Sequence, residues 1–165
     1  MIVVSNTSPI NYLLLIDHLD VIQQLFGGVF VPQAVCDELS RSYSPAVVRQ
    51  WAINLPEWVE VRHADVPDDL SDLHNGESET IALAGELTAD LVLLDERKAS
   101  KIARTRGLVV TGTLGVLGKA FAQDLIDLDE AFDRLKDTSF YVDPQLLREI
   151  LAREKTKRQD TGSSE

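Results

Sequence analysis

The chain has 165 residues, of which 44% are hydrophobic and 26% charged, and its formal net charge is −11. This length suits a single domain with one sizeable core. A chain this acidic does not hold nucleic acid by its overall charge, so a nucleic-acid ligand would require divalent cations and a local basic patch.

The sequence lacks the features of a disulfide-linked, zinc-binding or membrane protein. Its single cysteine, Cys36, excludes an internal disulfide, and its three histidines are too scattered for a zinc site. No basic segment precedes the first apolar run, and no apolar run approaches the roughly 20 residues that span a membrane. We therefore expect a cytoplasmic protein with no membrane segment.

A strand and a long helix are predicted at the start of the chain. Residues 1–5 are apolar and β-branched, and apolar residues then recur with a mainly helical period over 7–26. Asn6 lies at the junction, where the strand ends and the helix begins. In a parallel sheet such junctions share the carboxyl edge, which is where open α/β sheets bind ligands.

A second strand–helix unit and a peripheral strand are predicted next. Residues 29–31 read as a short strand, and 33–41 as a helix with Glu38 beside its packed face. Another helix is expected over 45–52, and the alternating residues 58–61 suggest an edge strand. A glutamate on a helix is most often solvated, so Glu38 becomes a site candidate only together with other acids.

Two acids flank the next helix–strand pair. Glu77 opens a helix whose apolar residues Ile81 and Ala84 lie on its own face, at i+4 and i+7. Residues 91–94 form an unbroken apolar strand, typical of one covered on both faces, and Asp95 follows it. Glu77 could simply be an acid of the first helical turn that the helix dipole stabilises, and Asp95 could cap the next helix. The recurrence of the pattern elsewhere in the chain favours a shared site.

The densest basic region follows directly. A helix predicted over 97–106 carries five arginine and lysine residues, of which Arg97 and Lys98 lie nearest to the acids. Such a helix beside carboxylates suits a phosphate-rich substrate. For any one of these residues alone, a solvated helix face is the commoner explanation.

The elements together predict an α/β protein, a three-layer α/β/α sandwich around a central, mainly parallel sheet. One domain is expected over 1–152, and the polar residues 153–165 read as a disordered tail. The remaining predicted elements are a strand at 108–110, a glycine-containing turn into a helix from 112, helices over 127–135 and 143–152, and a short strand at 140–142.

Four motifs in this order resemble those of the PIN domain: VVSNTSPINYL, VPQAVCDEL, GESETIALA and LVLLDERKASKIARTRGL-VVTGTLGVL. More narrowly, GE-x-E-x-x-ALA and V-TGTLGVL resemble a prokaryotic PIN-like subfamily. The match spans nearly the whole chain except the tail. The resemblance implies a divalent-metal-dependent ribonuclease, and many members of the family are toxins of toxin–antitoxin pairs.

The resemblance also implies a site. Mg²⁺ or Mn²⁺ would be held by Asn6, Glu38, Glu77 and Asp95, and the three acids among them would be catalytic. Nearby residues of lower rank are Glu79, Glu96 and Ser8, and Arg97 and Lys98 would contact the substrate phosphate. RNA is the implied partner, with an antitoxin protein or a second copy of this chain as others.

Asn6 departs from the family pattern, which has aspartate at this position. An amide oxygen can still bind a hard cation, but the site loses one negative charge. A second hypothesis is therefore a catalytically weakened module that binds nucleic acid or protein. A third, a phosphoacceptor receiver domain, needs paired acids after the first strand, where this chain offers only Asn6.

Overall fold

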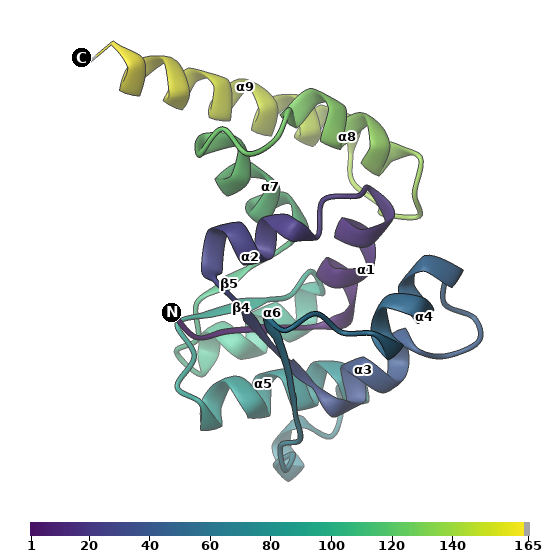
Figure 1. The fold of residues 1–165 in the computed structure, drawn as a ribbon. Helices are drawn as coiled ribbons and strands as arrows, with labels where there is room; N and C mark the ends of the chain where they lie inside the picture. Colours follow the sequence, from purple (N-terminus) through teal and green to yellow (C-terminus); the bar gives the residue numbers. More distant parts are fainter. Residues whose placement is uncertain (164–165) are drawn as a thin grey trace.

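The computed structural model describes residues 1–163, which form a parallel sheet of five strands with helices on both faces (Figure 1). The strand order is β3-β2-β1-β4-β5. The chain therefore adds β2 and β3 on one side of β1, and then β4 and β5 on its other side. The strands are β1 (Val3–Ser5), β2 (Val29–Pro32), β3 (Val59–Arg62), β4 (Leu91–Leu93) and β5 (Val110–Thr111).

Helices fill both outer layers, which confirms the predicted α/β/α sandwich. They are α1 (Thr7–Leu15), α2 (Asp20–Phe26), α3 (Gln33–Leu39), α4 (Ala46–Ile53), α5 (Asn75–Glu86), α6 (Arg97–Thr105), α7 (Thr113–Ala122), α8 (Leu128–Lys136) and α9 (Pro144–Gly162), with a short 3-10 turn at Asp68–Leu70. Within the described part of the chain, no helix is long and apolar enough to cross a membrane.

The alternation of side chains along the central strands creates two cores. Val3, Leu91 and Leu93 are buried in the larger core, which includes apolar residues of α1, α2 and α7. Val4 and Val92 point the opposite way, into a smaller core with α5 and α6. Because successive residues of a strand face opposite sides of the sheet, burial on both sides accounts for the unbroken apolar runs.

The sheet reverses its order between β1 and β4, which brings Asn6 close to the end of β4. Ser5 pairs with Leu93, and the Asn6 backbone N–H donates to the Leu93 carbonyl at 2.9 Å. Ligands of open α/β sheets bind at such a switch point, outside the carboxyl ends of the strands. Asn6 and Asp95 therefore extend from neighbouring strands at the edge where a ligand is expected.

Two predicted elements differ from the structure. The long first helix is broken into α1 and α2, with Asp17 at a φ of 60° between them. A helical apolar period continues across this break because both helices bury the same face, so periodicity alone cannot reveal it. The predicted strand at 140–142 is wrong: the residues there are irregular and connect α8 to α9.

The segment 153–165, predicted to be a disordered tail, begins within α9, which is helical to Gly162; residues 164–165 lie outside the described residues. Polar contacts hold this segment against the body of the protein. Lys155 pairs with Asp129 at 2.8 Å, and Arg158 pairs with Asp124 and lies 4.8 Å from the ring centroid of Phe121. Composition signals the absence of apolar residues here but not these tertiary partners.

Candidate functional site

Asn6 and Glu38 meet at the start of α5. Asn6 is 5% exposed, and its Oδ1 lies 3.4 Å from Thr80 Oγ1, whose hydroxyl donates to the Gly76 carbonyl at 2.6 Å. Thr7 Oγ1, at the start of α1, donates to Glu38 Oε2 of α3 at 2.7 Å and orients that carboxylate. A Cβ added at Gly76 would lie 2.8 Å from Glu38 Oε2 and 3.4 Å from Asn6 Oδ1, so glycine lets both oxygens approach the start of α5 closely.

Asp95 is held by the first residue of α7. Thr113 donates its backbone N–H to Asp95 Oδ1 and its hydroxyl to Oδ2, both at 2.7 Å. A Cβ added at Gly112 would lie 2.5 Å from Asp95 Oδ1, so this position must be glycine for the carboxylate to fit. Burial raises the pKa of Asp95, and the charge of Glu96 adds to the rise, whereas both hydrogen bonds from Thr113 lower it.

Burial and the neighbouring acids both affect the pKa of Glu77. Burial raises its pKa, and the charges of Glu96 and Glu38 raise it further, while the hydrogen bond from the backbone N–H of His74 opposes the shift. That bond, 3.3 Å long, places Glu77 as a cap of α5. Glu96 thus influences both Glu77 and Asp95, which makes it more closely involved than the sequence indicated.

Replacing Asp95 with asparagine should stabilise the fold at neutral pH, by about 0.5–2 kcal/mol. The folded state raises the pKa of this carboxyl, so its ionisation costs stability as the pH rises through the folded value. Asparagine can accept from the Thr113 N–H and donate to its hydroxyl. Urea unfolding in EDTA should show the gain at pH 7 and its loss below the pKa of an ordinary aspartate. An equal gain at both pH values would contradict this origin.

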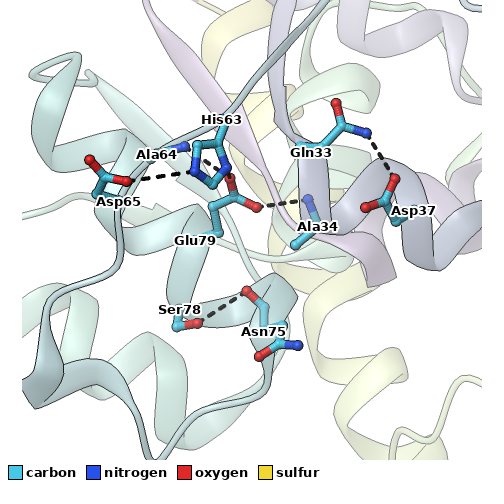
Figure 2. A network of polar contacts seen from close by, with 9 residues as sticks. All are labelled: Gln33, Ala34, Asp37, His63, Ala64, Asp65, Asn75, Ser78 and Glu79. Atoms are coloured by element: carbon cyan, nitrogen blue, oxygen red, sulfur yellow. Dashed lines mark hydrogen bonds and ion pairs between the residues drawn. The ribbon is translucent and has the colours of Figure 1, made fainter.

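Glu79 has a structural role that the sequence did not indicate (Figure 2). Its side chain is 5% exposed and accepts from the backbone N–H of Ala34 at 2.7 Å and from the N–H of Ala64 at 2.9 Å, and its Oε1 lies 2.9 Å from His63 Nδ1. It therefore joins α5 to the start of α3 and to the segment after β3. Both carboxylate oxygens are engaged in these contacts.

A cleft of about 900 Å³ opens beside Asp95, between α6, α7 and the segment that precedes α9. Arg97 and Arg104 line it from one face of α6, and Glu96 and Asp95 lie at its acidic end. Lys98 is exposed but is not among the lining residues. Of the two basic residues predicted to contact phosphate, Arg97 is thus the better placed.

The donor chemistry of this site fits a hard divalent cation, since amide and carboxylate oxygens are its preferred ligands. Two such oxygens, Asn6 Oδ1 and Glu38 Oε2, both lie close to Gly76, which gives them a common focus. Among residues 1–163, however, no three His, Cys, Asp or Glu side chains are already grouped to hold a metal ion. Glu77 or Asp95 would have to turn toward that focus, and the role of all four as ligands stays a prediction.

Three threonines support the candidate site, and the sequence analysis did not assign them. Thr7 and Thr113 donate to Glu38 and Asp95, respectively, and Thr80 Oγ1 lies 3.4 Å from Asn6 Oδ1. Thr7 stands next to Ser8, and the hydroxyl that meets an acid is that of Thr7. Two of these threonines could have been found from the sequence, because Thr7 directly follows Asn6 and Thr113 begins the helix after β5. Thr80, within α5, offered no such signal.

Comparison with known proteins agrees with this architecture. A family model described as a PIN domain matches residues 2–156. The fold is similar to that of a PilT N-terminus domain protein from the hyperthermophilic archaeon Sulfolobus solfataricus P2, with a TM-score of 0.51 and 17% identity, over 73% of this chain and 93% of that one. The search of curated proteins found no match. The family model covers nearly the whole chain, and this protein therefore belongs to the PIN domain family.

Proposed function

We propose that this protein is a divalent-metal-dependent ribonuclease that hydrolyses phosphodiester bonds with Mg²⁺ or Mn²⁺. The family supports a nuclease-like module, and PIN domains generally use divalent metal ions. The observation that carries the proposal is the placement of oxygen donors at the switch point of the sheet: Asn6 and Glu38 converge on Gly76, and Asp95 follows the adjacent strand.

The residues of the site have distinct roles in this proposal. Asn6, Glu38, Glu77 and Asp95 would hold the cation, which would activate a water and stabilise charge on the leaving oxygen. Thr113 donates two hydrogen bonds to Asp95 and sets the orientation of this carboxylate in the metal-free fold. Arg97 lines the cleft beside Asp95 and would orient the substrate phosphate.

A cation also resolves the electrostatic conflict among the acids. Glu38 and Glu96 both raise the pKa of Glu77, and Glu96 raises that of Asp95, so these carboxylates repel one another. A divalent ion between them would convert this repulsion into binding energy. The same ion would offset the negative field of an acidic protein toward RNA.

The proposal predicts cleavage of single-stranded RNA with Mn²⁺, and loss of cleavage in EDTA or after Asp95→Ala. The substitution removes a donor and leaves the Thr113 groups without their partner. The measurement is the initial rate on a fluorescently labelled oligoribonucleotide. Asp133→Ala, which removes an exposed acid of α8, is the matched control and should leave the rate unchanged. Equal cutting under all conditions would indicate a contaminating nuclease and leave the proposal without support.

Asn6 favours a second candidate function. Because the usual aspartate is missing, the same site could bind RNA or a protein without cleaving it. A toxin role in the cytoplasm, with an antitoxin as partner, is the biological setting that we propose for the active form. A small upstream reading frame with a DNA-binding N-terminus would support that setting.

A further inference from the structure

The segment before α9 forms one wall of the cleft beside Asp95. Residues 139–143, which we call the strap, connect α8 to α9 and contribute five of the residues that line this cleft of about 900 Å³. Arg97 and Arg104 of α6 line the same cleft. The strap thus shares a cleft with a basic helix and with the proposed catalytic acid.

Tyr12 of α1 fixes the strap in place. Its ring meets that of Phe140 edge to face, with centroids 4.9 Å apart and planes at 81°, and its hydroxyl lies 3.0 Å from Ser139 Oγ. Edge-to-face pairs add to the stability gained from burial. At the other end of the strap, Asp143 accepts from the Gln145 N–H at 2.8 Å and caps α9.

Tyr141 lies between these two anchors and is exposed. It is 94% exposed, although it is flanked by the half-buried Phe140 and Val142. An exposed aromatic side chain on an anchored segment is a rigid, preformed surface with few rotamers to lose on binding. Tyr141 is among the residues that line the cleft, together with Asp95 and the two arginines.

The charges of the cleft select the class of ligand. Arg97 and Arg104 lie one above the other on α6, and neither forms an ion pair with another of the described residues. In a chain with a net charge of −11, two such cations beside an exposed aromatic ring are a local exception. Guanidinium groups bind phosphates, and an aromatic face stacks on any nucleobase.

We infer that the strap is a base-stacking subsite: Tyr141 receives one unpaired nucleobase while Arg97 and Arg104 hold the phosphates next to it. This inference rests on the proposed function and makes it more specific. Stacking requires a base that has left its helix, so the subsite favours single-stranded over double-stranded RNA. It also tolerates different bases, because every base has a stacking face.

The test measures RNA binding with Ca²⁺ in place of Mn²⁺, so that a divalent cation is present, and a denaturing gel checks that the probe stays intact. The probe is a short fluorescein-labelled oligouridylate, compared with an abasic oligonucleotide of the same length by fluorescence anisotropy. Tyr141→Ala should weaken binding of the oligouridylate about tenfold, and Tyr141→Phe or Tyr141→Trp should restore it. Tyr43→Ala removes another exposed tyrosine, outside this cleft, and should have no effect.

Further variants separate the stacking from the charge. Arg104→Gln should weaken the binding of both probes and lower the salt dependence of that binding. The abasic probe should be indifferent to Tyr141→Ala. Because Tyr141 is so exposed, its variants should keep the wild-type unfolding midpoint.

Several results would overturn the inference: equal oligouridylate affinity of Tyr141→Ala and wild type, equal loss with Tyr43→Ala, or tight binding of the abasic probe. Failure to bind RNA at all, with a loss of self-association in Tyr141→Ala, would assign the surface to a protein contact instead. The ribonuclease proposal fails separately, if wild-type protein does not cleave with Mn²⁺. RNA binding that depends on Tyr141 without cleavage would retain the subsite and reject the enzyme.

Discussion

Replacement of Glu79 with alanine is expected to cost about 3–5 kcal/mol of stability, enough to unfold much of the protein. The side chain is 5% exposed and accepts hydrogen bonds from the backbone N–H groups of Ala34 and Ala64. Alanine would leave both donors without their partner. Chemical unfolding followed by circular dichroism measures this loss.

Two companion variants make the Glu79 prediction specific. Glu79→Gln keeps the shape and one acceptor oxygen, but its NH₂ group faces one of the two donors, so an intermediate loss is expected. Glu86→Ala removes an exposed glutamate from the same helix and should change stability by less than about 0.5 kcal/mol. If Glu79 were instead a metal ligand, its removal would matter only in the presence of Mn²⁺. Wild-type stability of Glu79→Ala in EDTA would therefore contradict the structural role.

The contrast between Glu77 and Glu79 shows how far sequence can assign acids to a site. Both belong to the same motif, GESET, and both lie in the first half of α5. One is half-buried among other carboxylates, and the other is buried among backbone donors of distant segments. Helical spacing places two residues on different faces of a helix, but it does not say what each face meets.

The sheet and its acidic edge were predictable because they depend on local signals. Apolar runs mark the strands, and the polar residue that follows each one must lie at the carboxyl edge of a parallel sheet. The hydroxyl groups that orient these acids depend on contacts across the fold, such as the one from Thr113 to Asp95. Such partners cannot be derived from spacing.

The C-terminal region was predicted least well, for a related reason. The strap has no backbone pairing and is positioned by Tyr12, more than a hundred residues earlier in the chain. The end of α9 has few apolar residues and is held by ion pairs and a cation–π contact. A helix that is held through its charged side chains has no apolar periodicity, and the sequence therefore showed no sign that this segment packs against the protein.

Asn6→Asp is expected to raise the rate of RNA cleavage about 100-fold at limiting Mn²⁺. At 4 Å and an effective dielectric constant of 20, one added charge is worth about 4 kcal/mol of attraction to a cation per unit of its charge. Part of this is offset, because Asn6 is buried and Glu38 lies close by. A net gain of about 2.8 kcal/mol corresponds to the 100-fold effect.

The same substitution should make stability dependent on metal, which gives a measurement that is independent of cleavage. Without a cation, the new carboxylate lies in a buried position beside Glu38 and should destabilise the fold by about 1–3 kcal/mol. Its place at the start of α1 reduces the penalty, since aspartate is favoured there. Mn²⁺ should then raise the unfolding midpoint of Asn6→Asp by more than that of wild type, because binding to the folded state alone stabilises it.

Asn54→Asp adds the same charge at the exposed end of α4 and should leave the response to Mn²⁺ unchanged. Wild-type protein that already cleaves as fast as Asn6→Asp would reject the weakened-module alternative, because the amide oxygen would then serve as well as a carboxylate. If Asn6→Asp gains neither activity nor Mn²⁺-dependent stability, the switch point of this sheet is not a cation site. The oxygens that converge on Gly76 would then serve to hold α1, α3 and α5 together.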